Sequence, residues 1–187
     1  MTPDLQQEFK LLSEKARRQL SEVTTGESYQ HVFSIWTWPT FGPSVRWTVY
    51  SPRPQARGKS AFASYTLWRS DLDLEKFRSP VERLRYPGDL APTIRDESVW
   101  LTANDVEGFV QFIRGISIPI FPENPSTFGL DGCRFEFRFA QMLFGGSSHW
   151  WENYPQEWRP FTEAIMKIIG DLNTQRTAKV QKDGATP

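Results

Sequence analysis

Side chains that could act as nucleophile and base gather near the end of the chain. Cys133 is the single cysteine, His149 is one of two histidines, and Glu152 follows it. A cysteine or serine hydrolase needs a base within hydrogen-bond reach of its nucleophile, so these three residues define a hydrolase-like alternative. Ser147 and Ser148 adjoin the histidine, but successive side chains of an extended strand point to opposite faces, which argues against direct pairing. A cysteine in a strand is also more often a small buried hydrophobic residue than a nucleophile.

Metal and phosphate sites have little support in the sequence. The histidines and the cysteine stand at positions 31, 149 and 133, whereas a zinc site needs three or four convergent ligands. The segment Gly145-Gly146-Ser147-Ser148 lacks the lysine of a phosphate-binding loop, and no Gly-x-Gly-x-x-Gly segment occurs. We therefore expect neither a metal nor a cofactor, and the leading interpretation has no catalytic residue.

Aromatic residues are the strongest signal in the composition. The chain has 8 Trp, 5 Tyr and 14 Phe among 187 residues. Large rings supply buried area in a core, but exposed tryptophans also anchor protein partners. If helices cover only one face of the predicted sheet, tryptophans on the other face form an exposed patch. The residues that we predict to bind a partner are Trp36, Trp38, Trp47, Trp150 and Trp151, together with Arg53 and Arg57 of a basic loop.

Charge argues against several classes of partner. The 22 basic residues balance 22 acidic ones, so no overall field attracts nucleic acid or an anionic membrane. No window approaches the ~18 consecutive apolar residues of a membrane helix. The N-terminus has Asp4, Glu8 and Lys10 where a secretory signal needs an apolar core. We therefore expect a cytoplasmic protein that binds a protein partner, with a toxin as one candidate, and that binds neither a membrane nor nucleic acid. The oligomeric state stays open.

The first two thirds of the chain alternate between helical and extended patterns. An amphipathic helix is predicted over 3–23, because Leu, Phe, Ala and Val recur at helical spacing. Aromatic and β-branched residues predict strands at 31–38, 44–50 and 60–68, and the short connections suit antiparallel neighbours. A helical region over 71–86 is interrupted by Pro80, and an extended piece follows at 93–101. Thr102 to Asp105 has capping-box spacing for a helix that ends near Gly115.

The last third predicts a hairpin and a helix. Three prolines between Ile118 and Thr127 favour an extended connection, and Asp131-Gly132 is typical of a turn. Phe135, Phe137 and Phe139 should face the core, while Arg134, Glu136 and Arg138 face solvent. Residues 142–151 should pair beside this strand, with Gly145-Gly146 as turn or bulge. The last helix is predicted from about Pro155 to Asn173.

Strands in runs, separated from helices, predict an α+β fold with an antiparallel sheet of about five to six strands. An N-terminal helix, central helices and a C-terminal amphipathic helix should pack on it, on one face. Residues 1–173 form a single domain in this interpretation, and 174–187 a disordered tail.

One part of the chain resembles known proteins. Residues 128–137 read FGLDGCRFEF and residues 150–161 read WWENYPQEWRPF. This region resembles the C-terminal part of small uncharacterised bacterial proteins with an LDG-x-x-[FY]-E hairpin, a tryptophan-rich strand and a P-x-x-W helix start. Several of those look like immunity or orphan accessory proteins with no assigned catalysis. The resemblance implies a turn, an aromatic ladder and a helix entry, and it carries over no functional residue.

These observations favour a non-catalytic cytosolic bacterial protein that acts by binding a macromolecule. A toxin-neutralising immunity protein is the most concrete version. The alternatives are the hydrolase-like enzyme around His149, Cys133 and Glu152, and a structural subunit of a larger assembly.

Overall fold

A computed structural model of the chain describes residues 3–22, 27–40, 42–79, 91–117, 132–141, 144–152 and 154–184. Four predicted features lie outside these residues. They are the helix end at 24–26, the part of the second helical region beyond Ser79, the proline-rich connection 118–127 and the turn residue Asp131.

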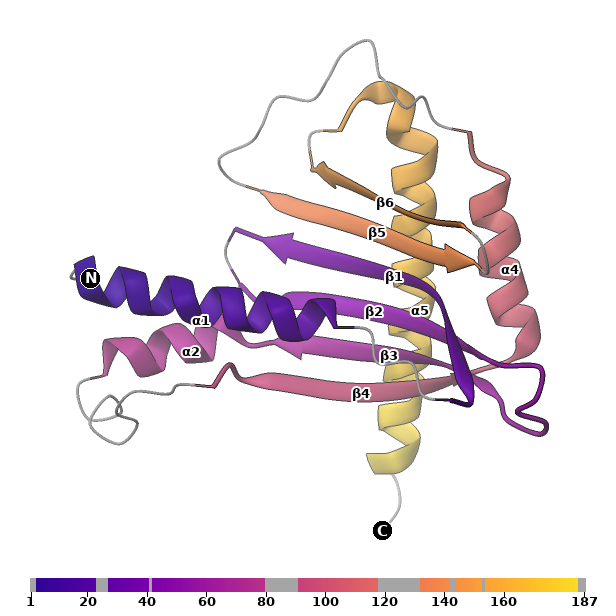
Figure 1. Cartoon of the computed structure of the whole chain (residues 1–187), viewed down its shortest axis with the longest axis horizontal. Coiled ribbons are helices and arrows are strands. Elements are labelled where there is room, and N and C mark those ends of the chain that lie inside the picture. Colours follow the sequence, from indigo (N-terminus) through magenta and orange to yellow (C-terminus); the bar gives the residue numbers. More distant parts are fainter. Residues whose placement is uncertain are drawn as a thin grey trace.

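The sheet has six strands in the order β4-β3-β2-β1-β5-β6, and each strand is antiparallel to its neighbours (Figure 1). The strands are β1 (Tyr29–Pro39), β2 (Ser44–Pro52), β3 (Ala61–Trp68), β4 (Ile94–Leu101), β5 (Cys133–Gln141) and β6 (Phe144–Trp151). The helices are α1 (Pro3–Ser21), α2 (Ser70–Arg78), α4 (Ala103–Arg114), the short 3-10 helix η1 (Gln156–Trp158) and α5 (Arg159–Gly184). This arrangement confirms the predicted α+β class and its antiparallel sheet.

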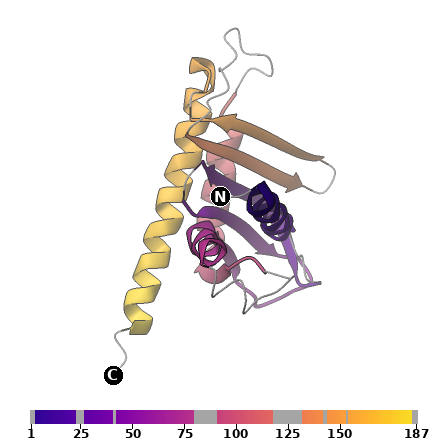
Figure 2. The same cartoon turned by 90° about the vertical axis from the view of Figure 1, so that its left-hand side faces the viewer.

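The main hydrophobic core lies between one face of the sheet and the helices α4 and α5, and Figure 2 shows α5 running along that side of the sheet. Side chains alternate between the two faces along each strand, so Phe33 and Ile35 of β1 point into this core while Ser34 and Trp36 point away. Phe137 of β5 and Ile165 of α5 belong to the same cluster. The predicted inward side of β5 is therefore confirmed at its centre.

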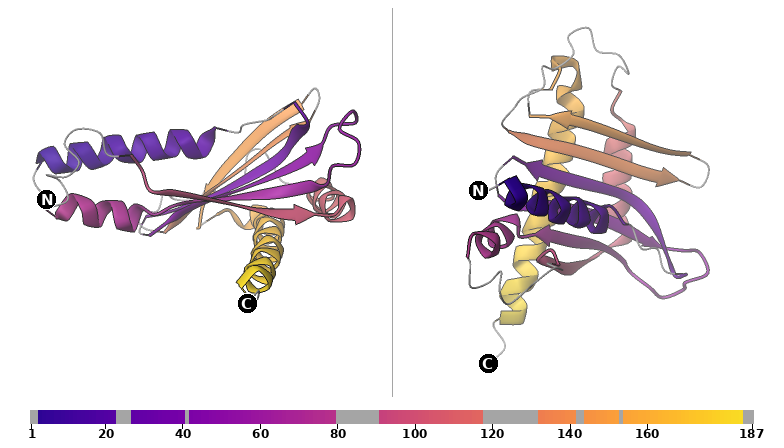
Figure 3. Two further views of the ribbon diagram at one scale, coloured as in Figure 1. Left: turned by 90° about the horizontal axis from the view of Figure 1, so that it is seen from below. Right: turned by 60° about the vertical axis from the view of Figure 1, so that its left-hand side comes forward.

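The opposite face of the sheet carries α1 and α2 over one end of the strands (Figure 3). Ala16 and Leu20 of α1 form a second, smaller cluster with Trp36 and Trp68. Cover on one face was the leading expectation, with cover on both faces left open, and helices lie on both faces. The physical reason is the alternation of β1 and β3, which aims two large indole rings away from the main core, where they need cover of their own.

Arg46 of β2 fixes the end of α1 on the sheet. Its guanidinium donates to the carbonyl of Leu20 and, at 2.7 Å, to that of Glu22. Trp36 Nε1 also donates to the Leu20 carbonyl, at 3.1 Å. The last carbonyls of a helix lack partners within the helix and carry partial negative charge, so a cation there is favourable.

Local signals set two further helix ends as predicted. Thr102 accepts from the backbone N–H of Asp105, and the Asp105 carboxylate accepts from the backbone N–H of Thr102 at 2.8 Å, which completes a capping box for α4. Helix α2 ends at Arg78, and Ser79 is extended with ψ 115°. A residue before proline disfavours the helical conformation, so Pro80 accounts for this end.

The β5–β6 hairpin differs from its prediction at the two glycines. Gly145 and Gly146 are neither turn nor bulge, because they pair in regular register with Ala140 and Phe139. The Phe139 ring lies over Gly146, where an added Cβ would come within 2.8 Å of the ring atom Cε1. The glycine is needed for this ring contact and not for a turn.

Helix α5 does not end at Asn173 but continues to Gly184, so the residues predicted as the start of a disordered tail are helical. Arg176 donates to both carboxylate oxygens of Glu97 on β4, at 2.6 and 3.0 Å. Lys179 donates to the carbonyl of Ser98 at 2.8 Å. These contacts hold the polar second half of the helix against the edge strand. No described helix combines the length and the apolar character that crossing a membrane requires.

Candidate functional site

A cleft of about 990 Å³ lies between α1, the start of α2 and one end of the sheet. Strand alternation puts Trp38, Trp68 and Arg134 on the sheet face that α1 covers, and the α1 side chains Ser13 and Arg17 form the opposite wall. Ala16 and Leu20 of α1 bury Trp36, whereas Trp38 is only partly buried against this cluster and lines the cleft.

Trp38 is the aromatic residue at the centre of this cleft. It is half-buried, and the guanidinium carbon of Arg17 lies 5.6 Å from its ring centroid. This distance falls within the range of a cation–π contact, which favours Arg and Trp. The pair offers an apolar ring with a positive charge beside it.

Arg134 brings a second positive charge to the same place, because its Cα is paired with that of Trp38 across β1 and β5. Its Nε atom is buried and has no hydrogen-bond partner within the described part of the chain. Among the described residues no carboxylate forms an ion pair with Arg17 or Arg134. Both guanidinium groups therefore keep charge that a ligand can use.

Two carboxylates line the cleft, and each is already paired. Glu136 accepts from Arg138 at 3.0 Å, and Asp71 accepts from Arg69 at 2.7 Å. The hydrogen bond from Arg69 lowers the pKa of Asp71 from 3.8 to about 2, so this carboxylate stays ionised and matched to its own arginine. The charge left over in the cleft is positive.

Three of the predicted partner-binding tryptophans cannot contact a partner. Trp36 and Trp47 are each 1% exposed and Trp150 is 4% exposed, since all three pack into the two cores. Trp38 does line the cleft, and the side chain of Trp151 lies outside the described residues. The prediction was wrong for the three buried rings because strand alternation alone does not say which face a helix covers.

The two predicted arginines lie elsewhere. Arg53 and Arg57 are exposed on the β2–β3 hairpin, at the other end of the strands from the cleft. The Nε atom of Arg53 donates to the Tyr29 carbonyl at 3.1 Å. Sequence reasoning missed Arg17 and Arg134, because their proximity depends on how α1 crosses the sheet.

In the hydrolase-like set, the backbone places His149 apart from Cys133. Burial raises the pKa of the Cys133 thiol from 9.0 to about 11, with a further rise from nearby Glu152, so the reactive thiolate is disfavoured. The Cα of His149 is paired with that of Glu136, three residues along β5 from the cysteine, which is about 10 Å at the rise of a strand. The side chain of His149 lies outside the described residues, and Glu152 is exposed beside Gly132.

A serine and a histidine do meet elsewhere. His31 Nε2 lies 2.8 Å from Ser34 Oγ, which in turn donates to Thr48 Oγ1 at 3.1 Å. Residues three apart in a strand normally face opposite sides, but the register with β2 shifts between His31 and Phe33, and this bulge at Val32 brings both to one face.

This pair is structural and not catalytic. Ser34 and Thr48 are both 0% exposed, so no substrate can reach the hydroxyl. The pKa of His31 is lowered from 6.5 to about 4, mainly by burial and further by the positive charges of Arg138 and Arg46. A hydrogen bond with the backbone of Phe33 raises the pKa and offsets part of this shift. The imidazole is thus neutral around pH 7 and completes a buried hydrogen-bond chain.

Within the described ranges no three His, Cys, Asp or Glu side chains converge as metal ligands would. No family model matches the sequence, and neither a curated protein nor a solved structure shows a significant match. The chemistry of the cleft is therefore the basis for assigning a function.

Proposed function

We propose that this chain is a non-catalytic cytoplasmic binding protein, and that the cleft beside Trp38 receives an acidic, partly apolar segment of a protein partner. The observation that carries the proposal is the unbalanced charge of Arg17 and Arg134 in a cleft whose own carboxylates are paired. Arginine next to an indole ring is a combination enriched among residues that dominate protein interfaces.

The chemistry of the occupant follows from the two guanidinium groups. A guanidinium presents several N–H donors in a planar fork that matches a carboxylate, and the resulting hydrogen bonds are among the stronger ones in proteins. Arg134 is partly buried and forms no ion pair with another described residue, so a carboxylate bound there gains attraction in a medium less polar than water. The Trp38 ring then offers a surface for an aliphatic or aromatic neighbour of that carboxylate.

A toxin-neutralising immunity protein is the most concrete version of this function. Such a protein needs a stable scaffold and a preformed recognition surface, and it needs no chemistry of its own. The fold supports this version because the walls of the cleft are helices and strands, and such elements hold recognition residues in place better than loops do.

The proposal is tested by selecting displayed peptides of random sequence against the full chain. We expect enrichment of Asp or Glu next to an apolar residue. Arg134→Glu should remove this preference, because it replaces an attraction with a repulsion, and Trp38→Ala should weaken binding of the selected peptides about tenfold or more. Arg57→Glu is the matched control, since the same charge change on the exposed hairpin leaves the cleft intact.

The same variants then serve in the native host. Capture with the unaltered chain should return a stoichiometric protein that Arg134→Glu loses and Arg57→Glu keeps. Peptides without acidic enrichment, or full binding by Arg134→Glu, would show that the cleft is not the recognition site.

A further inference from the structure

Four aromatic rings from four neighbouring strands line up on the sheet face that carries α1, at the end farthest from the cleft. They are Tyr29 of β1, Tyr50 of β2, Phe62 of β3 and Trp100 of β4, and we call them the aromatic row. The register pairs Tyr50 with Phe62 and Phe62 with Trp100. The ring centroids of Tyr29, Tyr50 and Trp100 lie 4.8 to 5.9 Å from that of Phe62, so the other three rings of the row all contact Phe62.

The outer end of the row is open to solvent. Trp100 is 63% exposed, the largest fraction of any big hydrophobic residue in the described part of the chain. Phe62 and Tyr29 are half-buried, and Tyr50 lies beneath them. Helices α1 and α2 cover the other end of the strands (Figure 3), so no described helix lies over the row.

The ring of Trp100 has no packing role that explains it. Its neighbours in β4, Val99 and Leu101, point into the main core, while Trp100 meets Phe62 edge-on with 68° between the ring planes. One face of the indole is thus left for a flat partner. An exposed ring of this size on a rigid strand is a surface on which another ring can stack.

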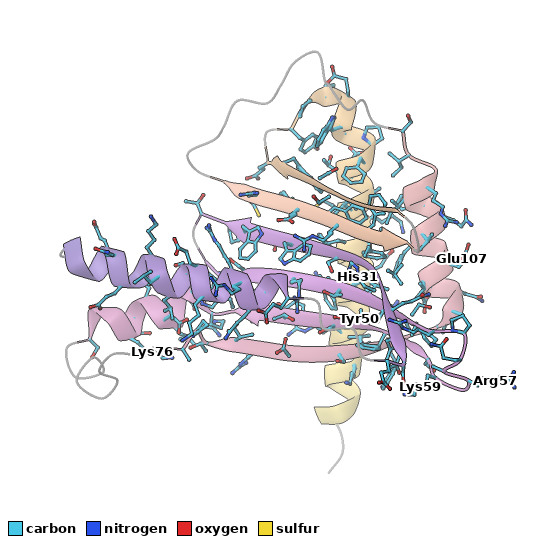
Figure 4. The ribbon with its side chains drawn as sticks, viewed as in Figure 1. His31, Tyr50, Arg57, Lys59, Lys76 and Glu107 are labelled. Carbon is cyan, nitrogen blue, oxygen red and sulfur yellow. The ribbon has the colours of Figure 1, made fainter. Side chains whose placement is uncertain are left out.

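Positive charges flank the row on one side. The β2–β3 hairpin carries Arg53, Arg57 and Lys59 at exposed positions, and no carboxylate lies between Ser51 and Ser60. Lys59 Nζ lies 5.4 Å from the Tyr29 ring centroid and donates to Ser28 Oγ at 2.8 Å, which holds the ammonium next to the row. Figure 4 shows Lys59 and Arg57 together at this end of the sheet.

Acidic side chains also lie near the row. Glu107 of α4 lines a pocket of about 680 Å³ together with Trp100 and Lys59. On β4 the nearest carboxylate of the same face is Asp96, four residues from Trp100 and so about 13 Å away along the strand. An anionic ligand is therefore directed to the hairpin side of the row.

We propose that the aromatic row and the basic hairpin bind single-stranded nucleic acid. Bases stack on Trp100 and Phe62, and the phosphates run beside Arg53, Arg57 and Lys59. Stacking platforms next to cationic grooves are the general means of holding single strands without sequence preference, because every base has a π face. Balanced net charge argued against nucleic acid at the level of the whole chain, but the local charge beside the row is positive.

This surface and the cleft are separate. Position 50 of β2 lies at the row and position 44 at the cleft, which is about 20 Å along the strand. Variants at one site should therefore leave the other unchanged, and the two proposals can fail independently.

The test is fluorescence anisotropy with labelled oligo(dT) and oligo(U) of about twelve nucleotides, a length within the range that one binding module covers. We expect binding at low salt that weakens as salt rises. Trp100→Ala should weaken it about five- to hundredfold, whereas Trp100→Phe should retain part of it, because a smaller ring can still stack. Circular dichroism should show that both Trp100 variants keep the fold, since the Trp100 ring is exposed.

A second set of variants separates charge from stacking. Arg57→Glu and Lys59→Glu should each weaken binding and lower the slope of log affinity against log salt by about one. Arg134→Glu in the cleft should leave oligonucleotide binding unchanged. The proposal would be overturned if the unaltered chain did not bind oligonucleotides at low salt, or if Trp100→Ala bound them equally well. It would also be overturned if the unaltered chain bound no oligonucleotide and Trp100→Ala lost a protein partner, because the row would then be a protein-docking surface.

Discussion

The guanidinium carbon of Arg176 lies 3.9 Å from the ring centroid of Tyr65 while the same side chain holds the Glu97 carboxylate with two hydrogen bonds. One residue of α5 thus ties together β3, β4 and the half of the helix that has few apolar residues. The same hydrogen bonds lower the pKa of Glu97 and raise that of Arg176.

Arg176→Ala should reduce the free energy of unfolding by about 1–2 kcal/mol, because it removes a bidentate pair and a cation–π contact that are only partly exposed. Hydrogen exchange should speed up over residues 176–184 more than elsewhere. Arg159→Ala is the matched control. It breaks an exposed pair with Glu163 within the same helix and should leave stability almost unchanged.

Stability should fall as the pH drops from about 6.5 towards 4, through His31. Its pKa is about 4 in the folded chain against 6.5 for a free side chain, so the unfolded chain binds a proton first and acid favours unfolding. Because the ring is partly exposed, we expect a loss of about 1–2 kcal/mol between pH 7 and pH 5. Urea unfolding at pH 7 and at pH 5 measures this loss. In His31→Gln the free energy of unfolding should change less between these two pH values. An unchanged profile in that variant would assign the acid sensitivity to other groups.

Gly146→Ala should destabilise the β5–β6 hairpin by about 1 kcal/mol, since its Cβ would meet the Phe139 ring at 2.8 Å. Phe139 is 40% exposed and can swing outward, which limits the cost. The double variant with Phe139→Ala should lose this extra penalty, as a double-mutant cycle of thermal unfolding would reveal. Additive effects would mean that the ring does not lie over the glycine.

Cys133 should react slowly with a thiol reagent near neutral pH, because a pKa of about 11 leaves very little thiolate. Its rate should rise towards that of the unfolded chain when urea is added. Fast labelling of the folded chain at pH 7.5 would contradict this expectation and would reopen the hydrolase-like alternative.

Local patterns in the sequence were sufficient for several elements. The alternation along β5 specified which side chains share a face, although Phe139 is 40% exposed and Arg134 and Glu136 line the cleft instead of facing open solvent. The spacing of Thr102 and Asp105 specified the start of α4. These signals act between residues close in sequence, where propensity and hydrogen bonding decide the structure.

The cleft could not be predicted in this way. Trp36 and Trp38 share one face of β1, and only the path of α1 decides that the first is buried and the second lines the cleft. Helix α5 was predicted too short for a similar reason, because Arg176 finds Glu97 across 79 positions of sequence. Contacts of this kind come from tertiary packing, which overrides local composition.

The place of β1 in the sheet has a consequence for synthesis of the chain on the ribosome. Its outer neighbour is β5, whose residues emerge about a hundred positions later. Until then the strand that carries Phe33, Ile35 and Trp36 keeps one edge of backbone donors and acceptors unpaired. The nascent chain is therefore most prone to aggregate before residues 133–141 have left the exit tunnel, and premature stops upstream of Cys133 should produce insoluble fragments.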